Sequence, residues 1–236
     1  MGMPTKRTIV TNSIIACTLL VLGFLAFNLN VYASSFSVMA PVTNGGRESN
    51  QIGLMLIIDN NDDANNLPEI IQTLTNANAG ATFFITGSIA VNNLATMAEL
   101  GEKFTIGNIG YSNTPLNIAD KDLITEEITL GGTLLKNLTK QSPHYFTPPQ
   151  GLYNKHTLNI AQNLGYQTVL PTDRGVVIDW QKADPSLVAS YATYQTQAGN
   201  IIALKPTTAT RQCLAQIIAE FLSQNYHVTS LSELLA

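Results

Sequence analysis

Residues 52–59 read Ile-Gly-Leu-Met-Leu-Ile-Ile-Asp, an unbroken apolar run that ends in a carboxylate. An apolar run of this length predicts a strand that is buried on both faces, as in a parallel sheet covered by helices. Further strand-like runs follow along the chain, and segments with helical apolar spacing separate them. The expected strands are 81–85, 104–108, 145–146, 169, 176–178, 201–204 and 227–228, and the expected helices are 67–79, 88–100, 120–138, 154–164, 208–223 and 230–235.

This alternation of strands and helices over about 185 residues predicts a parallel sheet covered by helices, either doubly wound or closed into a barrel. In a closed barrel the chemistry lies at the carboxyl ends of the strands. The segments that follow the expected strands are therefore the places to look for a site: 59–63, 108–116, 147–153, 179–180 and 205–208.

The composition limits the classes of function. The chain has 236 residues, of which 45% are hydrophobic and 12% are charged, so it holds enough apolar material for a full core. With 12 Lys and Arg against 16 Asp and Glu, it is not expected to have a nucleic acid as its main partner. The two cysteines, Cys17 and Cys213, give neither a disulfide framework nor a cysteine-based zinc site.

The N-terminal part of the chain is expected to lie outside the folded domain. Lys6 and Arg7 form a short positive segment, and residues 14–27 form an uncharged apolar block. As a helix this block covers about 21 Å, against roughly 30 Å of bilayer hydrocarbon, which favours a signal peptide over a full span. An uncleaved signal anchor is the alternative, and in both cases residues 1–33 direct export of the rest of the chain. Residues 34–51, with Ser, Pro, Gly and Asn, are expected to form a linker.

Seven short segments, in order along the chain, resemble motifs of the polysaccharide deacetylase (NodB-homology) family. The clearest is Ala-Thr-Phe-Phe-Ile-Thr-Gly at 81–87, which is similar to the family's A-T-F-F-x-x-G, and Phe-Thr-Pro-Pro-Gln-Gly at 146–151 is similar to F-R-P-P-Y-G. The other segments are 56–61, 106–116, 179–180, 201–205 and 225–234. The resemblance extends over residues 53–236, and the order and spacing of the segments make it specific.

The resemblance implies a distorted (β/α) barrel of about seven parallel strands, formed by residues 52–236 and preceded by an N-terminal hydrophobic helix. Family members bind a divalent metal, often zinc, through one Asp and two His. A neighbouring Asp is the base that activates the metal-bound water, an Arg orients this base, and a late His is the acid for the leaving amine.

This sequence departs from the family at most positions that carry the chemistry. The base is kept as Asp59, and the position of the acid His holds Lys205. The residues at the expected positions of the metal ligands and the Arg are Asn60, Ile109, Asn113 and Thr147. Ile offers no ligand atom and an Asn carbonyl is a weak neutral ligand, so no metal cofactor is expected. Zinc or another divalent metal would be required only if the protein is active after all.

Asp59 and Lys205 are both expected to point into the mouth of the barrel. An uncompensated carboxylate in a half-buried cleft costs on the order of a few kcal/mol, so the hypothesis is that Lys205 contacts Asp59 and replaces the metal centre. The alternative is an exposed lysine beside a structural aspartate, which leaves Asp59 as a vestigial base. Asp62 and Asp63 are interpreted as part of a solvated turn that caps a helix, with adventitious Ca²⁺ binding as the alternative.

These observations predict a catalytically inactive deacetylase-like protein that binds a polysaccharide such as peptidoglycan, or that assists other envelope proteins. The candidate substrate-binding residues are Tyr111, Pro149, Gly151, Tyr153 and Trp180. Packing or exposure at the rim explains the three aromatic residues as well. An active metal-dependent carbohydrate deacetylase and a membrane-tethered interaction module are the alternative functions. The domain is expected in the periplasm, outside the cell, or on the membrane through an uncleaved N-terminal segment.

Overall fold

The computed structural model describes residues 18–23, 40–172 and 182–236. The chain separates into two units, Met1–Met39 and Ala40–Ala236. In the first unit the described residues are helical and exposed. Among the described residues, no helix has both the length and the apolar character that a membrane span requires. Most of the predicted signal or anchor segment lies outside the described residues, so its role stays a prediction.

In the described part of the chain, seven parallel strands form one sheet with the order β5-β4-β3-β2-β1-β6, and β7 pairs with the start of β1. This arrangement confirms the predicted parallel α/β architecture. The strands are β1 Gln51–Ile58, β2 Thr82–Thr86, β3 Thr105–Gly110, β4 Tyr145–Phe146, β5 Gln167–Thr168, β6 Ile201–Leu204 and β7 His227–Thr229. The strand expected at 176–178 lies outside the described residues.

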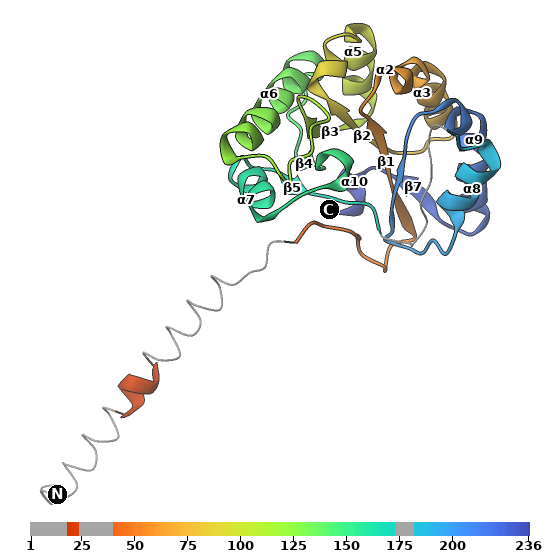
Figure 1. The fold of residues 1–236 in the computed structure, drawn as a ribbon. Helices are drawn as coiled ribbons and strands as arrows, with labels where there is room; N and C mark the ends of the chain where they lie inside the picture. Colours follow the sequence, from red (N-terminus) through yellow and green to blue (C-terminus); the bar gives the residue numbers. More distant parts are fainter. Residues whose placement is uncertain (1–17, 24–39, 173–181) are drawn as a thin grey trace, which may run out of the picture. The chain divides into compact units, whose positions relative to one another are not determined.

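Most of the helices surround the sheet on its outer side (Figure 1), whereas the short helix at Leu231–Leu234 packs against the inner side. The helices are α2 Asn61–Asn65, α3 Leu67–Asn76, α4 Gly87–Ala90, α5 Leu94–Lys103, α6 Lys121–Thr139, α7 Lys155–Asn163, α8 Pro185–Thr193, α9 Thr208–Ser223 and α10 Leu231–Leu234, with a 3₁₀ turn, η1, at Pro149–Gly151. Side-chain caps begin several of them: Asp120 caps α6, and Asn154 forms a capping box on α7. Helix α8 was not expected, although Asp184 caps it and a proline stands in its first turn.

The segment before β1 connects the two edges of the sheet. The N–H of Val42 donates to Thr168 at the end of β5, and the N–H of Gly45 donates to Gly199 just before β6. Thr172 also reaches β6, because its N–H donates to the carbonyl of Ile201. Part of the segment expected to be a linker is therefore hydrogen bonded into the folded domain, and it helps to close the sheet into a barrel.

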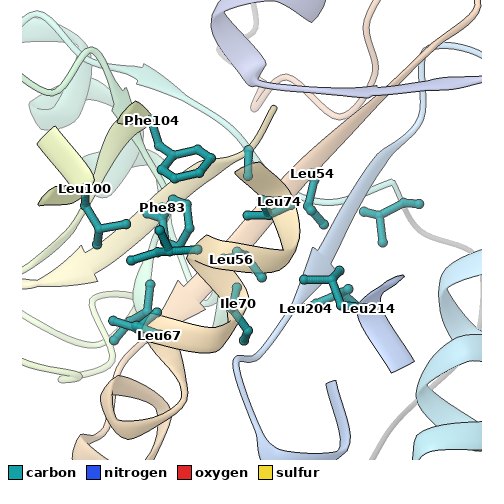
Figure 2. Close-up of a cluster of buried hydrophobic side chains, with 14 of the residues drawn as sticks. Leu54, Leu56, Leu67, Ile70, Leu74, Phe83, Leu100, Phe104, Leu204 and Leu214 are labelled. Carbon is teal, nitrogen blue, oxygen red and sulfur yellow. The ribbon is translucent and has the colours of Figure 1, made fainter. Parts of the chain in front are cut away.

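Strand β1 directs alternate side chains into two environments. Leu54 and Leu56 pack toward α3 and α9 in the large outer cluster of buried side chains (Figure 2). Met55 and Ile57 belong to a second cluster, which is formed by side chains of β2, β3, β4, β6 and α10 on the inner side of the sheet. Because side chains alternate along a strand, Asp59 follows Met55 and Ile57 on the inner side. The apolar run thus places its terminal carboxylate in the mouth of the barrel.

Candidate functional site

The carboxylate of Asp59 forms an ion pair with the ammonium of Lys205. The two residues follow neighbouring strands, since Leu56 of β1 is in register with Leu204 of β6. Only 7% of the Asp59 side chain and 24% of the Lys205 side chain are exposed. The predicted contact between the two residues is therefore present, while its functional role stays a prediction.

Asn113 engages the other oxygen of the same carboxylate. Its Nδ2 donates to Asp59 Oδ2 at 3.2 Å. Asn113 lies in the loop between β3 and α6, so the two oxygens of Asp59 are held from different elements. Among the described residues, the Oδ1 atom of Asn113 is one of a few buried polar atoms without a hydrogen-bond partner.

Asp63 is a buried member of the site that the sequence reading missed. The prediction that Asp63 belongs to a solvated turn is wrong, because only 2% of this residue is exposed. The turn does cap a helix, as expected, and the capping residue is Asn60, whose Oδ1 accepts the N–H of Asp63 at 2.9 Å. Burial, with a further contribution from the carboxylate of Asp59, raises the pKa of Asp63 to about 7, although Lys205 acts in the opposite direction. A signal was available: Asp63 lies four residues after Asp59, in the first turn of a helix that leaves the strand at once.

The other positions expected to carry chemistry are apolar or structural. Ile109 is buried in the inner cluster beside Met55 and Phe84. Thr147 is 5% exposed, and its N–H donates to the carbonyl of Asn108 at 3.0 Å. These two side chains therefore belong to the packing beneath the mouth.

The candidate sugar-binding residues differ in exposure. Tyr111 is 37% and Tyr153 is 39% exposed. Pro149 is buried, whereas Gly151 is exposed and has a φ of 71°, a conformation that favours glycine. Trp180 lies outside the described residues.

Hydrogen bonds join the loops that carry the two exposed tyrosines. Nε2 of Gln150 donates to the carbonyl of Asn113 at 3.1 Å, and Nδ2 of Asn154 donates to the carbonyl of Asn117 at 2.8 Å. The loop after β3 and the loop after β4 are thus connected at two points. Both loops follow carboxyl ends of neighbouring strands, so the exposed tyrosines stand at the rim of the same mouth as Asp59.

Comparisons with known proteins agree with this architecture. The model of the polysaccharide deacetylase family matches residues 46–169. The peptidoglycan-N-acetylglucosamine deacetylase of Bacillus cereus is 26% identical over 192 residues, which are 79% of this chain and 90% of that relative. The uncharacterized protein YlxY of Bacillus subtilis is 25% identical over 170 residues, or 72% of this chain. The match covers only 53% of YlxY, so the chain spans about half the length of this relative.

A solved structure shares the fold. The crystal structure of BA3943, described as a CE4 family pseudoenzyme from Bacillus anthracis, matches with a TM-score of 0.78 at 24% identity. The match covers 84% of this chain and 69% of that chain. A mutant of BA3943 is described as a pseudoenzyme with restored enzymatic activity. Together with the seven-stranded parallel sheet, this likeness confirms the predicted distorted barrel.

Proposed function

Because the chain belongs to the polysaccharide deacetylase family, we propose that it is a catalytically inactive member that binds a glycan of the cell envelope, such as peptidoglycan. One observation carries the proposal of inactivity. Lys205 and Asn113 each engage an oxygen of Asp59, the residue at the position of the family's base. A general base needs an oxygen that is free to accept a proton from the attacking water, and here both oxygens of the carboxylate already have partners.

The side chains at the expected metal positions support the same proposal. The amide oxygen of Asn60 already accepts the N–H of Asp63, and Ile109 has no ligand atom. The ammonium of Lys205 would repel a divalent cation beside Asp59. A zinc site needs about three protein ligands among His, Cys and carboxylate side chains, and these residues do not fit that requirement. We therefore derive no catalytic step through a metal.

The rim supports binding of a sugar chain. Tyr111 and Tyr153 expose aromatic rings on two connected loops. Ligand sites are commonly lined by aromatic side chains with a few polar groups that fix the orientation of the ligand. The relative from Bacillus cereus is named for a peptidoglycan substrate, which makes peptidoglycan the first glycan to test. Residues 1–33 would place the domain in the envelope, where such a glycan is present.

Co-sedimentation with insoluble peptidoglycan and chitin tests the proposal. We expect saturable binding by the wild-type protein and a loss of at least about tenfold in affinity in Tyr153→Ala, which corresponds to about 1.4 kcal/mol. Tyr194→Ala is the matched control, because Tyr194 is 47% exposed and lies at the end of α8, away from the mouth.

A parallel assay measures acetate release from the same glycans, with and without added zinc. We expect no release in either condition. Zinc-dependent acetate release would contradict the proposed inactivity. Absence of glycan binding by folded protein would contradict the proposed ligand and would favour a protein partner.

A further inference from the structure

We propose that the ammonium of Lys205 is the permanent cation of this site, and that the surrounding oxygens accept a hard divalent cation only when this ammonium is removed. The cation is thus supplied by the chain and not by a bound metal. This proposal concerns the centre of the site, and it holds whether or not a glycan binds at the rim.

The charges around Lys205 require a cation. The Asp59 carboxylate is 7% exposed, and Asp63 lies next to it with 2% exposure. Buried carboxylates persist only when a positive charge or hydrogen bonds compensate them. Lys205 supplies that positive charge, so removing its ammonium leaves Asp59 uncompensated in a nearly closed space.

The structure also fixes the position of Lys205. Its carbonyl accepts the N–H of Thr207 at 2.8 Å and the hydroxyl of Thr210 at 2.6 Å, both from the start of α9. Its ammonium reaches across to β1, where Asn113 holds the far side of the same carboxylate. Lys205 therefore joins the end of β6 to the end of β1, and the loop after β3 is linked to this lysine through Asp59.

Oxygen atoms of two residues that lie beside Asp59 form an incomplete set of ligands. Asp63 Oδ2 and Asn113 Oδ1 are buried, and neither has a hydrogen-bond partner among the described residues. The carboxylates of Asp59 and Asp63 offer oxygen atoms directly, and Asn113 offers one when its amide, whose Nδ2 faces Asp59 in the wild type, rotates. Oxygen ligands suit Ca²⁺ or Mn²⁺ better than zinc. The positive charge of Lys205 keeps such an ion out of the wild-type site.

The test compares wild-type protein with Lys205→Gln, which removes the charge but keeps a long polar side chain. Thermal unfolding is followed in EDTA and then with Ca²⁺ or Mn²⁺ at about 1 mM. For a site that binds the metal with a Kd of about 10 μM, this concentration is about 100 times the Kd. The matched control is Lys103→Gln, because Lys103 makes an exposed ion pair with Glu99. The double variant Asp59→Asn with Lys205→Gln removes both charges and gives a folded reference if the single variant does not fold in EDTA.

We expect the melting temperature of the wild type to be the same in EDTA and in either metal. Lys205→Gln should melt at a lower temperature in EDTA and regain roughly 5 to 11 °C when either metal is added at 100 times its Kd. The double variant should show no metal response, and Lys103→Gln should behave as the wild type. Three results would overturn the proposal: a wild-type metal response that Asp59→Asn abolishes, a Lys205→Gln variant as stable in EDTA as Lys103→Gln, or a destabilised Lys205→Gln variant that regains nothing when metal is added.

Discussion

The carboxylate of Glu127, on α6, accepts two hydrogen bonds from Ser112, one from the backbone N–H at 2.7 Å and one from the hydroxyl at 2.9 Å. Glu127 is 7% exposed, so these bonds are made largely out of contact with water. Ser112 lies between Tyr111 and Asn113 in the loop after β3. A buried carboxylate on a helix therefore fixes the loop that supplies one rim tyrosine and one partner of Asp59.

Glu127→Ala should destabilise the protein by about 3 kcal/mol, because it removes two hydrogen bonds to a charged group, each of which contributes about 1.5 to 3 kcal/mol. The backbone N–H of Ser112 loses its partner, and its hydroxyl keeps only Thr114, whose Oγ1 lies 2.7 Å away. Urea unfolding at neutral pH measures the change. Glu126→Ala is the matched control, because Glu126 is the adjacent residue of α6 and is exposed. Equal stability of the two variants would show that Glu127 does not hold the loop.

Asp63 should make the stability depend on pH. Its pKa is raised from 3.8 to about 7 in the folded protein, so between these values the folded state holds one more proton than the unfolded state. The favourable contribution is fully present below about pH 4, falls as the pH rises, and is lost above about pH 7. The slope for one proton cannot exceed about 1.4 kcal/mol per pH unit.

Asp63→Asn should remove this slope, and above pH 7 it should be at least as stable as the wild type, because its amide carries no charge to bury. The measurement is the free energy of unfolding in urea between pH 4 and pH 8. Asp62→Asn is the control, since Asp62 is exposed in the same helix. If the free energy of unfolding of Asp63→Asn differs from that of the wild type by the same amount at every pH, then a group other than Asp63 causes the pH dependence.

Closure of the barrel by the segment before β1 can be tested by truncation. Thr43 and Asn44 accept hydrogen bonds from the hydroxyl of Thr172 at 2.6 and 3.0 Å, in addition to the backbone bonds of Val42 and Gly45. A chain that starts at residue 40 should be as stable as the full chain. A chain that starts at residue 48 loses these contacts and should lose about 3 kcal/mol or more, at about 1 kcal/mol for each bond. Equal unfolding midpoints for the two truncated chains would show that residues 40–47 do not stabilise the closed barrel.

Apolar runs in the sequence were sufficient to predict most of the described strands. The pairing of Asp59 with Lys205 was predicted from the resemblance to the deacetylase family, which implies a barrel with both residues at its mouth. The contribution of Val42 and Gly45 was not predictable in this way, because their partners lie more than 120 residues away in the chain and no local periodicity reports such a pairing. The burial of Asp63 also depends on the packing of α2 against strand ends, and in the sequence only its position four residues after Asp59 pointed to it.

The two glycines of α6 illustrate the same limit. By propensity, Gly131 and Gly132 weaken the middle of this helix. The structure gives them a further role, because a Cβ atom on Gly131 would lie 2.4 Å from the carbonyl of Gly110, and one on Gly132 would lie 1.9 Å from the hydroxyl of Tyr166. The glycines allow α6 to approach the end of β3 closely, directly before the loop that carries Asn113.

Gly131→Ala should therefore destabilise the protein although alanine favours a helix. The gain in helix propensity is about 1 kcal/mol, whereas a clash with backbone atoms forces the helix and strand apart at a cost of about 1 to 3 kcal/mol or more. Thr133→Ala is the control, because Thr133 is exposed on the same helix and this change should stabilise the protein by about 0.5 kcal/mol. Thermal unfolding of the two variants distinguishes the cases. If Gly131→Ala gains stability, as is expected of Thr133→Ala, then α6 can move away from β3 at little cost, and the close approach at Gly131 is not required for stability.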